Sequence, residues 1–314
     1  MDLARFPREL ERAILEAAAD SDSNFIPTLL LVAHRAHVWL EPLLYRQVHI
    51  SMNCRWKRAQ DAFFRIATTR PPSFLAKSVR VMTLEFHDGT TVATQDLLDR
   101  VYPALLLCTG VQEVAVNGSE EMKIGPTLLP LLSAMPLRRL GVFFEDLMPH
   151  PIPMEGHATA FSALTHLDVY DNEEQNIHSR DLSRIIPFLA ALPNLTHLAV
   201  NILLDLPVVK RILDGCSRLQ ILAFLIPALD YELSTFMDGV QRIAESSGDP
   251  RIFGTTYKSW TEVFSTTQFS FWRAIDILVD QKRNGLVDRN HASTGDIYNK
   301  DTQDAVAKQI RALF

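Results

Sequence analysis

Two histidines and an aspartate occupy a repeated word of the sequence. The words LTHLDV and LTHLAV place His166 and His197 at equivalent positions, and Asp168 follows the first histidine by two residues. If both words form neighbouring strands, the two imidazoles lie about 4.8 Å apart and Asp168 points to the same face. Imidazole and carboxylate groups are common zinc ligands. The repetition explains the histidine pair without a metal, so we predict no metal and no other cofactor.

The sequence lacks the signatures of common catalytic nucleophiles and metalloproteases. Neither G-x-S-x-G nor H-E-x-x-H occurs, and Cys54, Cys108 and Cys216 fit no catalytic or C-x-x-C pattern. An enzyme would also need a deep pocket with convergent polar groups, which a surface of strands seldom supplies. We therefore expect a protein without enzymatic activity. An enzyme is a third alternative, after the two binding functions described below.

Composition narrows the possible partners and compartments. The chain has 314 residues, of which 47% are hydrophobic, and a net charge of −6, which disfavours general binding to nucleic acids or anionic membranes. The basic stretch 55–70 contains Phe63 and Phe64, and we expect it to be a linking amphipathic helix. We expect the protein in the cytoplasm or nucleus. The three cysteines are separated, which favours a reducing compartment, and the sequence has no secretory leader pattern. It also has no apolar run of about 18 residues that could span a membrane.

A short pattern, apolar-x-x-apolar-x-apolar, recurs six times between residues 78 and 226. Successive copies are 24 to 31 residues apart. The end of each copy alternates at period two, as a strand with one buried face requires. The pattern therefore predicts six strands of one array. The fourth positions of the copies are Leu84, Val114, Leu140, Leu167, Leu198 and Leu222.

Helix-like stretches lie between these strands. Residues 181–192 and 229–243 repeat apolar side chains at three- and four-residue steps, which places them on one helical face. Pro187 can shorten the first helix, and Asp230 can cap the second. A doubly wound nucleotide-binding sheet also alternates strand and helix, but neither glycine-rich phosphate motif occurs. We therefore expect an α/β fold, a curved leucine-rich-repeat-like solenoid with parallel strands and helices on one side.

In such an array, the residues that flank each buried pair form an exposed concave face. Aromatic, histidine and acidic side chains among small ones suit a protein or peptide partner, because aromatic rings supply contact area at low entropic cost. An ordinary solvated sheet face is the alternative. The residues that we expect to contact this unknown protein substrate are Arg139, Phe143, His166, Asp168, Tyr170, His197 and Asn201.

Residues 1–50 lack the repeat and predict two or three short helices. Their apolar residues exceed what so short a segment can bury, so we expect them to pack on the array, on a partner, or on both. The words FPRELERAILEAA and LLLVAHRAHVWLEPLLYRQVHI resemble the F-box, although Ala33 and His34 replace the usual Cys-Lys pair and Trp39 falls later than the family tryptophan. By this resemblance, the adaptor-binding residues are Pro7, Leu10, Ile14, Leu31, Val32 and Trp39.

An F-box followed by loose leucine-rich repeats resembles a large fungal family of F-box-like proteins, and DPRIFGTTYKSW with FSFWRAIDILVDQKRNG is similar to the close of those chains. The resemblance implies a substrate receptor that recruits the Skp-type adaptor of a cullin-RING ubiquitin ligase. A repeat scaffold without a ligase connection is the second reading. We expect four segments: the F-box-like module at 1–50, a linking helix at 51–77, the array at 78–258, and a C-terminal helix with a polar tail at 259–314.

Overall fold

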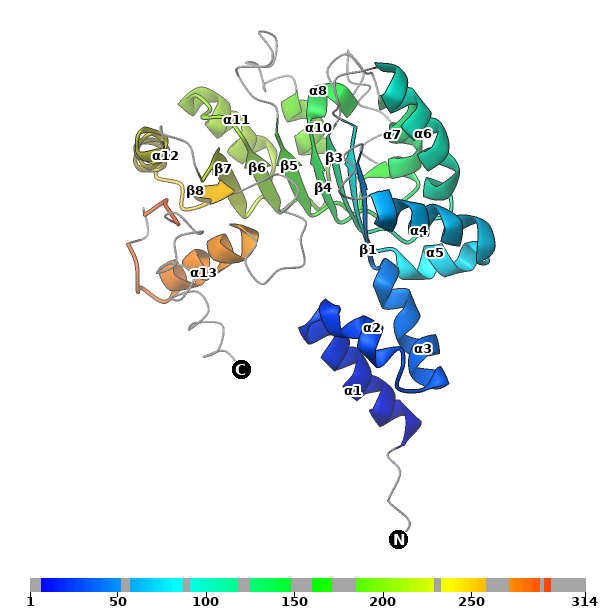
Figure 1. Ribbon diagram of the computed structural model, residues 1–314. Coiled ribbons are helices and arrows are strands. Elements are labelled where there is room, and N and C mark those ends of the chain that lie inside the picture. The colour runs from blue at the N-terminus through cyan, green and yellow to red at the C-terminus, as the bar shows by residue number, and fades with distance from the viewer. Residues whose placement is uncertain are drawn as a thin grey trace. The chain divides into compact units, whose positions relative to one another are not determined.

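The chain divides into two compact units, Met1–Gln112 and Glu113–Phe314. In the described residues, no helix is both long and apolar enough to cross a membrane. The computed structural model describes residues 7–51, 57–86, 91–117, 125–147, 160–170, 185–228, 233–257, 271–288 and 291–294 (Figure 1).

The first unit begins with a cluster of short helices. Asp22 ends the first helix and accepts a hydrogen bond at its side chain from the backbone N–H of Asn24, which starts the next turn. A small core of Ala19, Ile26 and Leu40 holds these helices together. The elements are α1 (Arg8–Ser21), η1 (Ser23–Phe25), α2 (Ile26–Leu29), α3 (His34–Leu40) and η2 (Glu41–Tyr45).

Two parallel strands and three further helices belong to the described part of the first unit. Strand β1 was not expected, and it pairs in parallel with β2, placing Ile50 opposite Leu84. The expected linking helix is two helices, because Pro72 has no N–H to continue the first helix and instead begins the second. These elements are β1 (Gln47–Ser51), α4 (Lys57–Thr69), α5 (Pro72–Ser78), β2 (Val81–Glu85) and α6 (Thr91–Leu105).

The second unit contains a parallel sheet whose described strands follow one another in chain order from β3 to β8. The register aligns equivalent positions of the repeated words, so that Leu167 lies opposite Leu198 and Leu198 opposite Leu222. Each of the six repeated words contains a strand, which confirms the α/β class with parallel strands. The strands are β3 (Glu113–Asn117), β4 (Arg139–Val142), β5 (His166–Val169), β6 (His197–Val200), β7 (Ile221–Pro227) and β8 (Ile252–Tyr257).

Helices alternate with these strands. The helix expected at 181–192 is observed as Ile186–Ala191, because Pro187 lies in its first turn, where a missing N–H costs nothing. Residues 181–184 and Asp230 lie outside the described residues, as does the polar tail from 295 onward. The helices are α7 (Gly125–Ser133), α8 (Phe144–Leu147), α10 (Ile186–Ala191), α11 (Leu206–Gly215), α12 (Leu233–Ser247) and α13 (Phe271–Arg283).

Helix α13 follows the expected array at 78–258, and in the second unit it lies on the side of the strands opposite to α10 and α11 (Figure 1). A β-carbon built at Gly254 would meet Val240 of α12, whereas its neighbour Phe253 lies under the ammonium group of Lys282 in α13. Since adjacent residues of a strand point to opposite faces, α12 and α13 cover opposite faces of β8. The strand face that α13 covers carries polar residues, so the sequence did not predict that a helix packs on it.

Candidate functional site

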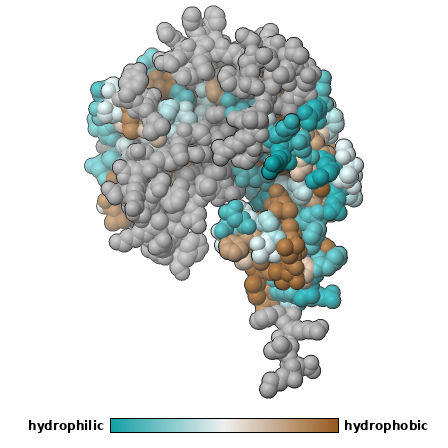
Figure 2. Space-filling view, in the orientation of Figure 1, coloured by the Kyte–Doolittle hydropathy of each residue, from teal (hydrophilic) through white to brown (hydrophobic). Residues whose placement is uncertain are grey.

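The N-terminal helices expose a group of large apolar side chains. Leu10 and Ile14 on α1 are 46% and 51% exposed, and Leu31 and Val32 before α3 are 86% and 64% exposed. We call these four residues the apolar N-terminal face. Figure 2 shows brown, hydrophobic side chains gathered over these helices.

The local sequence explains why this face stays open. Helix α1 is apolar on more than one side: Leu15 and Ala19 pack against the small core, and Leu10 and Ile14 point elsewhere. Pro7 precedes the helix, is exposed, and provides no side-chain cap. A core of so few residues cannot also bury the outer residues. Exposed apolar side chains that form a contiguous patch are typical of interaction surfaces.

Trp39, the remaining expected adaptor-binding residue, has a mixed position. Its ring is partly buried and packs against the small core. It also lines a cavity of about 440 Å³ together with Val38 and with three basic or titratable side chains, Arg8, His34 and Arg35. Arg35 donates hydrogen bonds to both carboxylate oxygens of Glu11 at 2.6 to 3.0 Å and so joins α3 to α1. This hydrogen bonding by Arg35 lowers the pKa of Glu11.

In the second unit, the two histidines of the repeated word lie on neighbouring strands. The rings of His166 and His197 stack with centroids 4.0 Å apart and planes 12° from parallel. The hydroxyl groups of Thr165 and Thr196 each lie within hydrogen-bonding distance of a backbone carbonyl and of Nδ1 of the following histidine, at 2.9 and 2.7 Å from Nδ1. The rings therefore lie parallel, and their Nδ1 atoms are occupied by hydrogen bonds. The parallel rings follow from the equivalent positions of the two histidines in the repeated words, which the register places opposite one another.

Asp168 is the centre of a buried polar network. Its carboxylate is fully buried and accepts hydrogen bonds from Nε and Nη2 of Arg139 at 3.1 and 2.8 Å and from the indole N–H of Trp272 at 3.0 Å. Burial raises the pKa of Asp168, and Arg139 and Trp272 oppose that rise. Burial, followed by the charges of His197 and Arg139, lowers the pKa of His166 to about 3, so this ring is neutral near pH 7.

We call Arg139, His166, Asp168 and His197 the histidine face. The expectation that this face is exposed is wrong, because α13 covers it. The Trp272 ring lies nearly perpendicular to both imidazoles, with centroid distances of 5.3 and 5.1 Å.

The other expected concave residues follow the histidine face toward the carboxyl ends of the strands. Tyr170 is buried between the rings of Phe143 and Tyr257, at centroid distances of 6.0 and 5.9 Å. Asn201 is half-buried, and its backbone N–H donates to the carbonyl of Val169. The structure therefore brings Arg139, His166, Asp168 and His197 into one contact network and groups Phe143 with Tyr170 in an aromatic cluster beside it.

Trp272 is a residue of this network that the sequence did not predict. The segment FWRAIDILVDQKR has an amphipathic spacing, with Trp272, Ile275 and Leu278 three residues apart and all buried. That spacing predicts a helix with one apolar face. It does not predict that the indole N–H reaches a carboxylate 104 residues earlier in the chain.

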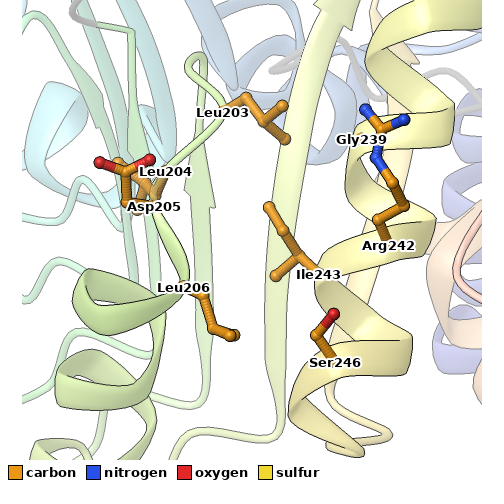
Figure 3. Close-up of a pocket in the computed structure, with 8 residues that line it drawn as sticks. All are labelled: Leu203, Leu204, Asp205, Leu206, Gly239, Arg242, Ile243 and Ser246. Atoms are coloured by element: carbon orange, nitrogen blue, oxygen red, sulfur yellow. The ribbon is translucent and has the colours of Figure 1, made fainter.

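A smaller cavity of about 260 Å³ lies between the turn after β6 and helix α12 (Figure 3). Most of its wall is apolar, and Figure 3 shows Asp205 and Arg242 on opposite sides of it. Among the described residues, no histidine, cysteine or lysine lines it. Its lining consists of Leu203, Leu204, Asp205, Leu206, Gly239, Arg242, Ile243 and Ser246.

Comparison with known proteins gives no family. No family model matches the chain, and no curated protein shows significant similarity to it.

Proposed function

We propose that this chain is a substrate-recognition subunit of a Skp-cullin-F-box type ubiquitin ligase and has no catalytic activity of its own. In this proposal, residues 1–50 are an F-box-like module that binds a Skp-type adaptor. The strands and helices that follow are a leucine-rich-repeat-like solenoid that holds a protein substrate. The proposed location is the cytoplasm or nucleus, with no membrane or nucleic-acid partner.

The observation that carries this proposal is the exposure of the apolar N-terminal face. Fully burying a leucine or isoleucine side chain stabilises a complex by about 1.5–3 kcal/mol, and a few such anchors commonly dominate an interface. Two such positions lie on α1 and two in the turn before α3, and the small core of these helices consists of Ala19, Ile26 and Leu40. The F-box resemblance of the same segment supplies the identity of the proposed partner.

Substitution within the apolar N-terminal face tests the proposal. Leu10→Asp together with Ile14→Asp places two charges against an apolar partner surface, where an unpaired charge costs several kcal/mol, so capture of a purified Skp-type adaptor should be lost. The matched control adds the same two charges at exposed polar positions, Ser23→Asp with Thr28→Asp, and should keep full capture.

Circular dichroism and thermal melting of both double variants separate loss of binding from loss of fold. Wild-type protein that captures no Skp-type adaptor at low salt and high concentration contradicts the proposal and leaves the repeat scaffold as the better function. Equal capture by the Asp double variant and the control would show that the adaptor binds elsewhere.

A further inference from the structure

The two faces of β4, β5 and β6 have opposite chemistry. One face is aliphatic and fully buried, as at Leu167 and Val169. The other face carries a guanidinium, two imidazoles and a carboxylate, which together form the histidine face, and small residues at Gly141 and Ala199. An aliphatic sheet face must stay covered, because its exposure to water costs about 25 cal/mol for each Å². A polar face can be hydrated when its cover leaves.

Helix α13 covers the histidine face as an amphipathic ligand would. Phe271, Trp272 and Ile275 are buried, whereas Asp280 is exposed. Asp276 is also exposed, and its Oδ1 lies 3.7 Å from Nε2 of His197. Three side chains of α13 reach the histidine face: Trp272, Asp276 and Phe271. The indole of Trp272 contacts both imidazoles and donates to Asp168. The Arg139 guanidinium also lies 5.7 Å from the centre of the Phe271 ring.

We propose that the histidine face is a receptor for an amphipathic helix that carries one tryptophan, and that α13 fills this receptor in the free chain. A substrate helix of the same chemistry displaces α13. This inference depends on the proposed function only for the statement that the displacing helix belongs to a substrate.

Helix α13 can leave the histidine face without leaving the carboxylate of Asp168 unpaired. Arg139 donates two hydrogen bonds to Oδ2 of Asp168, and these bonds do not involve α13. When α13 leaves, the ion pair stays formed and Oδ1, which loses the indole N–H, gains access to water. Removal of one partner from a fully buried pair would by contrast be strongly destabilising.

The same contacts define the displacing helix. It needs a tryptophan as donor to Asp168, apolar residues three and six positions later, as Ile275 and Leu278 are in α13, and polar residues on its outer side. Phenylalanine in place of tryptophan leaves Oδ1 of Asp168 buried without its donor, which should weaken binding about tenfold or more.

A synthetic peptide with the sequence of residues 271–284, blocked at both ends and labelled with a fluorophore, serves as the probe. Its binding is measured by fluorescence anisotropy with three full-length proteins: wild type, Trp272→Ala and the control Asp280→Ala, which changes an exposed residue of α13. We expect Trp272→Ala to bind the peptide at least about tenfold more tightly than the other two proteins, because its own helix competes poorly. The peptide with phenylalanine at the tryptophan position should bind about tenfold more weakly.

Equal binding to the wild type and Trp272→Ala, or no binding to either at millimolar protein, would overturn the inference and make α13 a fixed part of the core. If Trp272→Ala does not fold, Trp272→Phe takes its place, since it keeps the ring packing and removes only the donor. Adaptor capture by the same proteins separates the two proposals. Capture without peptide binding overturns the receptor alone, and peptide binding without capture by wild type overturns the ligase function alone.

Discussion

Leu198→Ala tests the packing of the sheet in the second unit. Leu198 is fully buried in β6, and the register places it between Leu167 and Leu222, which are themselves fully buried. Neighbours held by two adjacent strands cannot move in to fill the space that the missing side chain leaves. We therefore expect a loss in the upper part of the range for leucine truncation, about 3–5 kcal/mol. For a folding unit of this size, that corresponds to a melting temperature lower by roughly 6–20 °C.

The free energies of unfolding come from urea titrations followed by circular dichroism. Leu286→Ala is the matched control, because it makes the same chemical change in the same unit at a side chain that is 73% exposed. The control should change the free energy of unfolding by less than about 0.5 kcal/mol. Equal losses in the two variants, or a loss below about 1 kcal/mol at Leu198, would refute the packing that the register implies.

Three further predictions follow from buried groups. Gly110→Ala should cost about 1–3 kcal/mol in urea unfolding, because a β-carbon there overlaps the carbonyl oxygen of Ala76, and no loss would contradict this close approach. The pKa of His166 falls from 6.5 to about 3 on folding, so its contribution to stability is complete above pH 6.5 and is lost as the pH falls toward 3. Between about pH 7.5 and about pH 5, the urea midpoint of the wild type should therefore fall further than that of His166→Gln. Equal falls in the two proteins would contradict this prediction. Burial raises the pKa values of the Cys108 and Cys216 thiols to about 12 and about 11. A thiol reagent near pH 7 should therefore modify these two residues only after unfolding. Rapid labelling of the folded protein at either residue, identified by mass spectrometry, would contradict this prediction.

The repeated apolar words predicted the strands because their spacing reports which side chains must be buried. Leu167 and Val169 alternate with polar residues and both are buried in β5. Strand β1 was missed although Val48 and Ile50 alternate in the same way, because its segment was assigned to the N-terminal helical module. Strand β8 was missed because its six buried or half-buried residues show no alternation of polarity.

The covering of the histidine face could not be predicted from the sequence. The hydrogen-bonding groups of His166 and Asp168 suggested a face in contact with water. Burial of such groups requires partners, and the partner of Asp168 that lies outside the strands is Trp272 on α13. The amphipathic spacing of α13 predicts that one face must be covered, but this pattern contains no information about which surface it covers. The exposure of Leu10 and Ile14 was likewise one of two outcomes that the sequence left open.

Calorimetric titration of the wild-type chain with a purified Skp-type adaptor tests the ligase function most directly. We predict saturable one-to-one binding with a dissociation constant of about 1 μM or tighter, and loss of that binding when Leu10 and Ile14 are both replaced by aspartate. Burial of the apolar N-terminal face should also give a negative heat-capacity change, which the temperature dependence of the binding enthalpy reports. No saturable binding with adaptor at about 100 μM, by a chain whose circular dichroism shows that it is folded, would contradict the proposed function.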